Sequence, residues 1–205
     1  PAPLSKGMQY EAAANACLLQ ARIAQDTPQL DISGNFYADM PTPTTIGAME
    51  SYSSRDEYIK KGCSTVELVS GKYKMVDFVT TYHPVGEEPA QFRYVRNLIL
   101  DFNVRFGYYL LEQINVVNHV IASNDQQVSA SNVIKPKQWL QIVNNYAVDL
   151  GKRALIADVP FMQESIEVDL SSTNPDRLET FFRYKRTGIA RIASTTAEAG
   201  FNFGS

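Results

Sequence analysis

Residues 91–121, QFRYVRNLILDFNVRFGYYLLEQINVVNHVI, carry the longest helical pattern of this 205-residue chain. Most positions are Val, Leu, Ile, Phe or Tyr, and the polar residues recur at steps of three, four or seven: Asn97, Asp101, Arg105, Glu112, Asn115 and His119. Such spacing places them on one narrow stripe of a helix. A helix with a single narrow polar stripe must be covered on most of its circumference. We therefore expect it to be the central helix of the domain or part of an interface between copies.

Three further helices are predicted around this segment. Residues 8–24 form an Ala-rich helix, whose small side chains allow close packing. Ser54 as N-cap and Glu57 three residues later form a capping box for a short helix. Residues 136–158 form an amphipathic helix with a proline in its first turn.

Two hairpins are predicted from alternating apolar and polar residues. The first joins 65–69 to 73–82 through a Ser-Gly-Lys turn, and the second joins 166–170 to 178–184 through SSTNPDR. Residues 189–194 are a further strand candidate. The fold class is therefore α+β, with a small mixed or antiparallel sheet from two hairpins, a long central helix, two or three further helices and an extended terminal arm.

We predict one domain over residues 1–205. It comprises the 8–24 helix, an irregular segment 25–52 rich in Pro, Thr, Gly and Asp, an α+β core over 53–194 and a C-terminal arm over 195–205. Because the sequence begins with Pro rather than Met, we expect polypeptide ahead of residue 1.

The chain ends in GFNFGS, which places Phe201 and Phe203 at a terminus where solvent is the default environment. Burying a Phe side chain stabilises by roughly 1.5–3 kcal/mol relative to leaving it exposed. Either the tail folds back on its own domain or another molecule receives it.

Bulk properties exclude several function classes. The net charge of −3 provides no basic field for nucleic acid. No apolar run reaches the 18 or so residues of a membrane span, so we expect a soluble protein. Cys17 and Cys63 are interpreted as two reduced, partly buried thiols, although one disulfide between them stays an alternative.

Catalytic motifs are missing from the sequence. It contains no GxSxG elbow, Gly-rich phosphate loop, HExxH or paired Cys/His spacing, so we predict no enzymatic activity, metal or cofactor. The only imidazoles are His83 and His119, and a thiol site could be drawn from Cys63, His83 and Asp77. We interpret His83 as a turn-capping or solvated residue, and His119 as a residue near the C-terminal end of the long helix, where the helix dipole favours a cation.

Charged residues mark two further features. Asp101 and Arg105 are spaced as a surface i,i+4 salt bridge. Basic residues gather along the last predicted strands: Arg183, Lys185, Arg186 and Arg191. They form the solvated face of a hairpin or a contact for an acidic partner protein, and nucleic-acid binding ranks third because the chain is acidic overall.

Ordered motifs over 53–82 and 160–204 resemble the C-terminal part of contractile phage tail sheath proteins, closest to the Mu-like type. The residues that carry the resemblance are Arg55, Tyr58, Gly62, Thr65, Gly71, Thr80, Thr81, Tyr82, Tyr184, Lys185, Gly188, Ile192, Ser194, Thr195, Gly200, Phe201, Phe203 and Gly204. Complete sheath proteins are longer and carry further, outward-facing domains.

The resemblance implies a structural subunit that polymerises helically around a tail tube and contracts to drive the tube through a cell envelope for genome ejection. Implied partners are other copies of the chain, the tail tube protein, and the baseplate and tail terminator proteins. The implied location is the virion, with the host cytoplasm during assembly. A bacteriocin or secretion-system sheath is the related alternative.

The resemblance also implies site residues. Extended arms of this family add strands to sheets of adjacent subunits, which assigns the subunit interface to Ile192, Ser194, Thr195, Gly200, Phe201, Phe203 and Gly204. A helix on the inner surface contacts the tube, for which helix 137–156 is the candidate, with Lys137, Lys152 and Arg153 as charged contacts.

Two function classes remain as alternatives to the structural subunit. One is a monomeric α+β protein-binding module in which the tail folds onto its own sheet and 25–52 forms the partner surface. The other is an enzyme that uses His83 and a carboxylate.

Overall fold

The computed structural model describes residues 4–43, 51–83, 86, 91–191 and 193–196. Its helices are α1 (Gln9–Asp26), α2 (Tyr52–Lys60), α3 (Val95–Asn115), α4 (Pro136–Lys152) and α5 (Val159–Glu164). Its strands are β1 (Thr65–Val69), β2 (Lys72–Asp77), β3 (Val120–Ile121), β4 (Val133–Ile134), β5 (Glu167–Leu170) and β6 (Leu178–Phe181). The predicted α+β class is confirmed.

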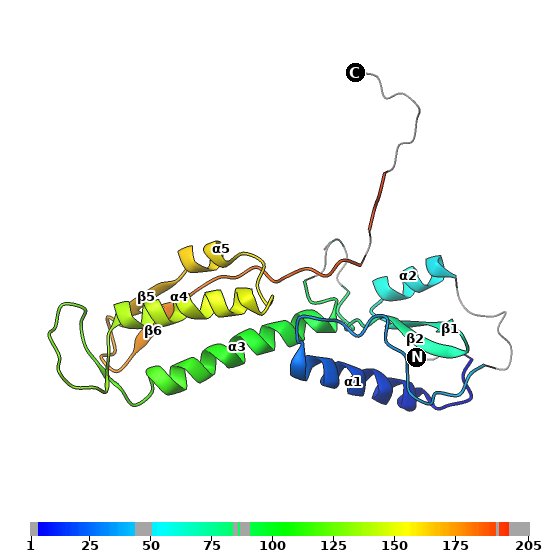
Figure 1. Cartoon of the computed structure of the whole chain (residues 1–205), viewed down its shortest axis with the longest axis horizontal. Helices are drawn as coiled ribbons and strands as arrows, with labels where there is room; N and C mark the ends of the chain where they lie inside the picture. The colour runs from blue at the N-terminus through cyan, green and yellow to red at the C-terminus, as the bar shows by residue number, and fades with distance from the viewer. Residues whose placement is uncertain (1–3, 44–50, 84–85, 87–90, 192, 197–205) are drawn as a thin grey trace, which may run out of the picture.

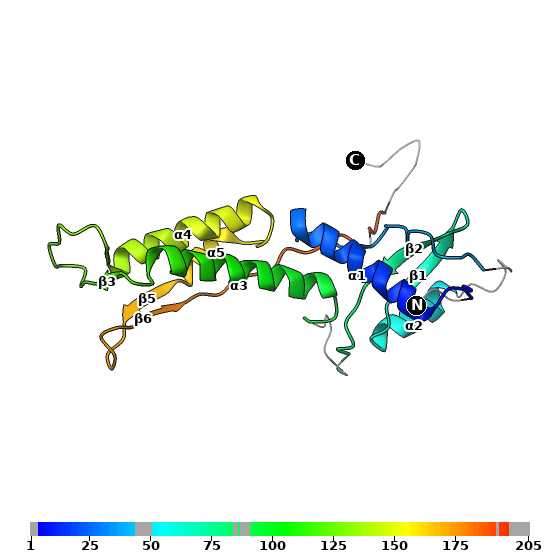
Figure 2. The same cartoon turned by 90° about the horizontal axis from the view of Figure 1, so that it is seen from below.

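The molecule is elongated and has two lobes (Figures 1 and 2). The N-terminal lobe contains α1, α2 and the β1–β2 hairpin. The C-terminal lobe contains α4, α5 and the strands β3–β6, and α3 extends along it from the junction of the two lobes (Figure 1). The two predicted hairpins therefore lie in separate two-stranded sheets, and β3 and β4 form a third, parallel pair.

The N-terminal lobe is built on the β1–β2 hairpin, whose register pairs Leu68 with Tyr73. Residues 34–37 cover the other edge of β2, where the Tyr37 amide donates to the Tyr73 carbonyl at 2.8 Å. The core between the hairpin and α1 is formed by Ala12, Ala16, Ile32, Tyr37, Met40, Val66, Tyr73 and Met75. The alanines of α1 therefore serve close packing, as their size predicted.

The C-terminal lobe is built on the packing of α3 against α4. Leu100 and Val104 of α3 are fully buried against α4 residues such as Ala147. The Tyr146 hydroxyl donates to the Val104 carbonyl at 2.6 Å. Trp139 is also buried, and its indole N–H donates to Thr180 Oγ1 at 2.9 Å, which connects α4 to β6.

The long helix and the second amphipathic helix are both shorter than predicted. α3 ends at Asn115 because the chain turns at Asn118, whose φ of 64° is incompatible with a right-handed helix. α4 ends at Lys152 because Ala154 has a φ of 54°. A separate helix, α5, follows from its own N-cap, Asp158, whose carboxylate accepts the Phe161 amide at 3.0 Å.

Three smaller predictions are corrected. The N-cap of α2 is Ser51, whose hydroxyl accepts the Ser54 amide, so the helix starts earlier than predicted. The strand predicted over 189–194 is wrong for 189–191 and 193–194, which have no strand structure. Asp101 is buried rather than on an exposed stripe, and it pairs with the C-terminal segment rather than with Arg105.

The α1 helix and β1 are close to their predicted bounds, whereas the second strand, predicted over 73–82, ends at Asp77. α1 covers Gln9–Asp26, and β1 matches its prediction residue for residue. Within the part of the chain that the structure describes, no helix combines the length and the apolar character needed to cross a membrane.

Candidate functional site: the C-terminal segment

The C-terminal segment, defined here as residues 182–191 and 193–196, connects the two lobes. After β6 it passes beside 154–158, where the Ala157 amide donates to the Lys185 carbonyl at 2.8 Å. It then crosses to the N-terminal lobe and extends away from the body of the molecule (Figure 1). Three arginines hold it before it leaves.

The first contact is between Arg186 and the buried Asp101 of α3. The guanidinium donates from Nε to Asp101 Oδ1 at 2.8 Å and from Nη2 to Oδ2 at 2.6 Å, a bidentate pair. The Tyr184 hydroxyl donates to the same Oδ1 at 2.8 Å. Hydrogen bonding to Asp101 raises the pKa of Arg186, and burial raises the pKa of Tyr184. Asp101 therefore holds both Tyr184 and Arg186, which are two positions apart in the segment.

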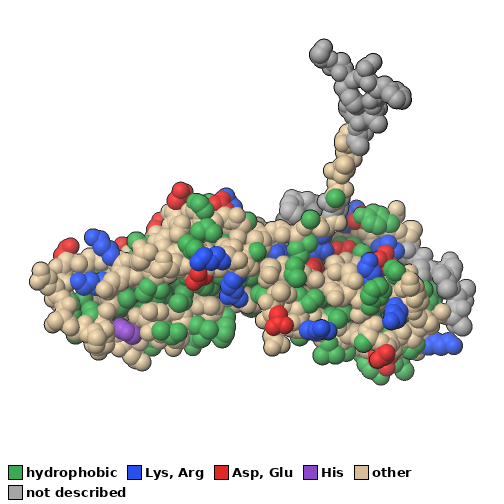
Figure 3. Space-filling view, in the orientation of Figure 1, with side chains coloured by type: hydrophobic (Ala, Val, Ile, Leu, Met, Phe, Trp, Pro, Cys, Tyr) green, Lys and Arg blue, Asp and Glu red, His purple; other side chains and the backbone are tan. Residues whose placement is uncertain are grey.

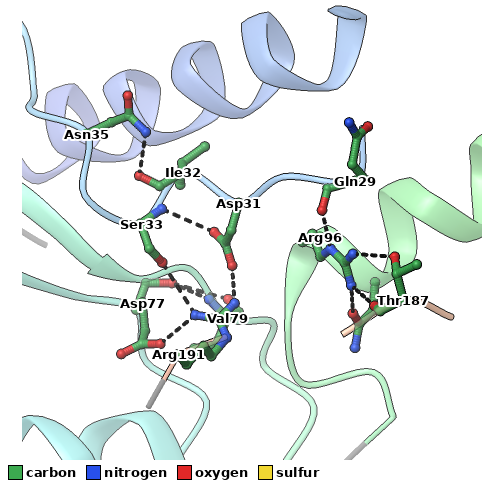
Figure 4. A network of polar contacts seen from close by, with 12 residues as sticks. Gln29, Asp31, Ile32, Ser33, Asn35, Asp77, Val79, Arg96, Thr187 and Arg191 are labelled. Atoms are coloured by element: carbon green, nitrogen blue, oxygen red, sulfur yellow. Dashed lines mark hydrogen bonds and ion pairs between the residues drawn. The ribbon is translucent and has the colours of Figure 1, made fainter. Parts of the chain in front are cut away.

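The second contact is made by Arg96, which is buried at the start of α3 (Figure 4). Its Nη1 donates to the Thr187 carbonyl at 2.5 Å and its Nη2 to Thr187 Oγ1 at 2.8 Å. Its Nε donates to the Gln29 carbonyl at 2.7 Å. Burial lowers the pKa of Arg96. The Arg96 guanidinium therefore links three parts of the chain: the residues that follow α1, the start of α3 and the C-terminal segment.

The third contact is Arg191, which reaches two carboxylates of the N-terminal lobe (Figure 4). Its Nη1 donates to Asp77 Oδ1 at 2.9 Å, and its Nη2 donates to Asp31 Oδ2. The guanidinium carbon lies 3.8 Å from the centroid of the Tyr94 ring, a cation–π contact. Burial raises the pKa of Asp77, the neighbouring Asp31 adds to the rise, and Arg191 opposes it.

A groove of about 770 Å³ lies next to Arg191. It is bounded by α2, the end of β2 and residues 189–191. Its apolar lining comes from Leu30, Tyr52, Ile59 and Ile189, and its charged lining includes Arg55, Asp56 and Lys60. The groove is thus closed on one side by the C-terminal segment itself.

Beyond Arg191 the segment loses contact with the body. Residues 193–196 are all exposed. Residues 188–191 and 193–196 make no backbone-to-backbone hydrogen bond with any other described residue. Backbone N–H and C=O groups are obligatory hydrogen-bonding groups. The exposed stretch 193–196 therefore leaves these groups without a backbone partner among the described residues.

The predicted interface residues fall mostly beyond this point. Ser194 and Thr195 are exposed on the departing segment. The other five lie outside the described residues: Ile192, Gly200, Phe201, Phe203 and Gly204. Their role as a subunit interface stays a prediction.

The four basic residues do not share one exposed face. Arg186 and Arg191 bind internal carboxylates. Arg183 and Lys185 are exposed and lie near the Phe161 ring, and Lys185 Nζ is 2.7 Å from Asp158 Oδ2. An acidic partner could meet Arg183 and Lys185 without breaking a contact of the other two, and this stays a prediction.

The three predicted tube contacts are exposed at the two ends of α4. Lys137 lies in its first turn, and Lys152 and Arg153 lie at its C-terminal end. Lys152 Nζ is 3.7 Å from Asp149 Oδ1, a surface ion pair of small energetic value. Their assignment to a tube stays a prediction.

The histidines and cysteines are at the surface. His83 is exposed, with Nδ1 2.6 Å from the Thr81 carbonyl, and His119 Nδ1 is 3.2 Å from the Val117 carbonyl. Cys17 and Cys63 are free and exposed, so the prediction of partly buried thiols is wrong. No group of three or more metal-ligating side chains occurs among the described residues.

Sequence reasoning missed the internal partners of the segment. Arg96, Asp31 and Asp101 contact residues 83 to 160 positions away in the sequence. The available signal was Arg96, which lies outside the predicted polar stripe of its helix, because a buried arginine requires partners.

The fold is similar to a solved structure described as the cryo-EM structure of the anti-feeding prophage (AFP) baseplate, 6-fold symmetrised. The TM-score is 0.60 at 11% sequence identity, and the match covers 91% of this chain and 49% of that chain. This chain thus spans about half the length of the solved chain. No protein-family model matches the sequence, and no curated protein matches it.

Proposed function

We propose that this chain is a structural subunit of a contractile tail sheath, which polymerises helically around a tail tube and contracts to drive the tube through a cell envelope. Two findings support this proposal. The fold is similar to a chain of the solved anti-feeding prophage baseplate, and the ordered motifs resemble those of sheath proteins. The observation that carries the proposal is the course of the C-terminal segment. It is bound to the body of the molecule as far as Arg191 and then extends away from it.

The departing segment supplies the means of polymerisation. Its unpaired backbone can add a strand to a sheet of a neighbouring copy, and alternate side chains then set the register. Phe201 and Phe203 are two residues apart, so both point to one face of such a strand. Donating an arm to the next copy is a heterologous contact, which propagates into rings and helices rather than closing as a dimer.

The arginine contacts give the arm a fixed point of departure. The C-terminal segment is held at both ends of its passage between the lobes, by Arg186 and Arg96 at one end and by Arg191 at the other. A pull on the arm is therefore transmitted to α3 and to the N-terminal lobe. Contraction would use packing energy stored at assembly, without a nucleotide. Partners would be other copies, the tube protein, contacted through Lys137, Lys152 and Arg153, and the baseplate and terminator proteins of a virion.

Deleting the residues after Ser194 tests the proposal. We expect the truncated chain to keep its circular dichroism spectrum and melting temperature but to form no tubes or stacked rings in negative-stain electron microscopy. A matched pair refines the test: Phe201→Ser with Phe203→Ser should reduce assembly, whereas Asn202→Ser between them should not. Normal polymerisation of the truncated chain would refute arm exchange.

The groove favours a second candidate function, a monomeric protein-binding module. Its volume of about 770 Å³ and its mixed apolar and charged lining suit a short peptide. On this alternative the chain stays monomeric at high concentration, and truncation after Ser194 lowers its stability.

A further inference from the structure

The outer face of α3 is apolar and exposed. Its Phe102 and Phe106 side chains are 63% and 62% exposed, and Ile114 is 70% exposed. We define this outer face as Phe102, Phe106, Tyr109, Leu110 and Ile114 of α3, together with Val117 just after the helix. Green side chains gather along the lower edge of the left-hand lobe in Figure 3, where α3 lies.

The spacing of these residues forms a helix-packing ridge. Phe102, Phe106, Leu110 and Ile114 follow one another at steps of four, which is the row that packs into grooves of a facing helix. The Phe106 and Tyr109 rings stack with centroids 6.2 Å apart, which holds the ridge in shape. The exposed polar residues between Phe102 and Val117 are Arg105 and Gln113.

The outer face is separate from the core of its own lobe. Leu100 and Val104 occupy the opposite side of α3 and are already fully buried against α4 and its neighbours. No described residue covers the outer face. The exposure of the outer face therefore does not mean that the core of the C-terminal lobe is incompletely packed.

The area of the outer face matches what association requires. With 150–250 Å² for each large aromatic side chain, its six residues expose on the order of 600 Å² of apolar surface. This is at the upper end of the largest patches on monomeric proteins. It approaches the roughly 800 Å² that each partner buries in a stable protein–protein interface.

We propose that the outer face of α3 is an interface with a second copy of this chain. The proposal rests on the proposed function, which makes other copies the permanent partners. Permanent interfaces are more apolar than transient ones. The six side chains of the outer face carry no charge, which fits such a permanent interface.

A pair of variants tests this interface in the full chain. Phe102→Ser with Phe106→Ser should raise the dissociation constant of self-association about tenfold or more in analytical ultracentrifugation, because anchoring aromatics dominate interface energy. The control is Phe181→Ser on β6, which removes a Phe that is 52% exposed but lies off the outer face. Equal melting temperatures of all three proteins show that folding is unaffected.

A photo-crosslinking benzophenylalanine in place of Ile114 identifies the partner. We expect crosslinked dimers and higher oligomers of this chain, with peptides of the same sequence on both sides of the link. Only monomer, despite self-association of the protein, would overturn the interface, as would capture of a different protein when the chain is expressed with its particle.

The two proposals fail in different ways. If the Phe102/Phe106 variant assembles normally while truncation after Ser194 abolishes assembly, the outer face is not an interface and the arm proposal stands. If the variant loses assembly and the truncated chain keeps it, the outer face is an interface and arm exchange is wrong. A wild-type chain that stays monomeric at high concentration overturns the outer-face proposal.

Discussion

Two faces of α3 are apolar and have opposite environments. On the inner face Leu100 and Val104 have no exposed surface, whereas on the outer face Phe102 and Phe106 are more than 60% exposed. These residues alternate within a single turn or two of one helix. Apolar character therefore predicts that a face will be covered, but it does not say whether the same chain or another molecule covers it.

The energetic consequences of the two faces differ. Burial on the inner face stabilises each copy, because it removes apolar surface from water during folding. Apolar side chains on the outer face contribute little to folding and are available for association. Mutations on the two faces should therefore separate stability from assembly.

The largest effect on stability should come from Leu100→Ala on the inner face. Removing a fully buried leucine leaves a cavity and costs about 2–5 kcal/mol of unfolding free energy. Urea denaturation followed by circular dichroism measures the loss. A loss below about 1 kcal/mol would mean that the inner face is not packed as described.

A smaller effect is expected from Gly107→Ala, which adds a methyl group between α3 and α4. The new Cβ would lie 2.6 Å from the Tyr146 hydroxyl oxygen, so either the Tyr146 side chain or the helices must shift. Overpacking of this kind costs roughly 1–3 kcal/mol. Gly188→Ala is the matched control, because an added Cβ there meets no described atom within 4 Å. Equal stability of the two variants would contradict close packing at Gly107.

Alkaline pH should loosen the inner face through Tyr146. Burial raises the pKa of Tyr146 to about 12, above the 10.0 of an unperturbed tyrosine. Between pH 10 and 12 the unfolded chain releases this proton more readily than the folded chain does, so stability falls as the pH rises. The stability is fully present below pH 10.

Tyr146→Phe measures this contribution. The variant loses the hydrogen bond to the Val104 carbonyl, which costs about 1 kcal/mol at neutral pH. Its melting temperature should then fall less between pH 9 and pH 11.5 than that of the wild type. An unchanged pH profile would show that Tyr146 ionises as easily in the folded chain as in the unfolded one.

The smallest effect on folding should come from Phe102→Ala on the outer face. This change removes more side chain than Leu100→Ala does, yet the loss in unfolding free energy should stay within about 0.5 kcal/mol. The comparison holds for dilute protein, where self-association does not contribute. A loss comparable to that of Leu100→Ala would show that the outer face is covered within the monomer.

Much of the secondary structure could be predicted from local patterns. The β1–β2 hairpin and α1 follow from alternation and from an Ala-rich helical run. The ends of α3 and α4 could not be predicted, because positive φ angles at Asn118 and Ala154 end these helices without a glycine or proline to mark them. The N-cap of α2 was misplaced because serine at either 51 or 54 can cap a helix, and only Ser54 has an acidic residue, Glu57, three positions later.

The candidate site was predictable only in part. The cluster of Arg183, Lys185, Arg186 and Arg191 was evident in the sequence. Its division into exposed and internally paired residues was not, because Asp101 lies 85 positions before Arg186, and Asp31 lies 160 positions before Arg191. Periodicity reports which residues share a face, and it carries no information about partners at such distances.

By itself, the sequence determined that α3 would be a long helix with apolar residues around most of its circumference, because the 3.6-residue period depends only on local spacing. Only the tertiary structure decided that α4 covers one side of α3, that Asp101 is buried beneath the C-terminal segment, and that Phe102, Phe106 and Ile114 stay exposed. These outcomes depend on which segments meet in space, and that is set by the packing of the whole chain.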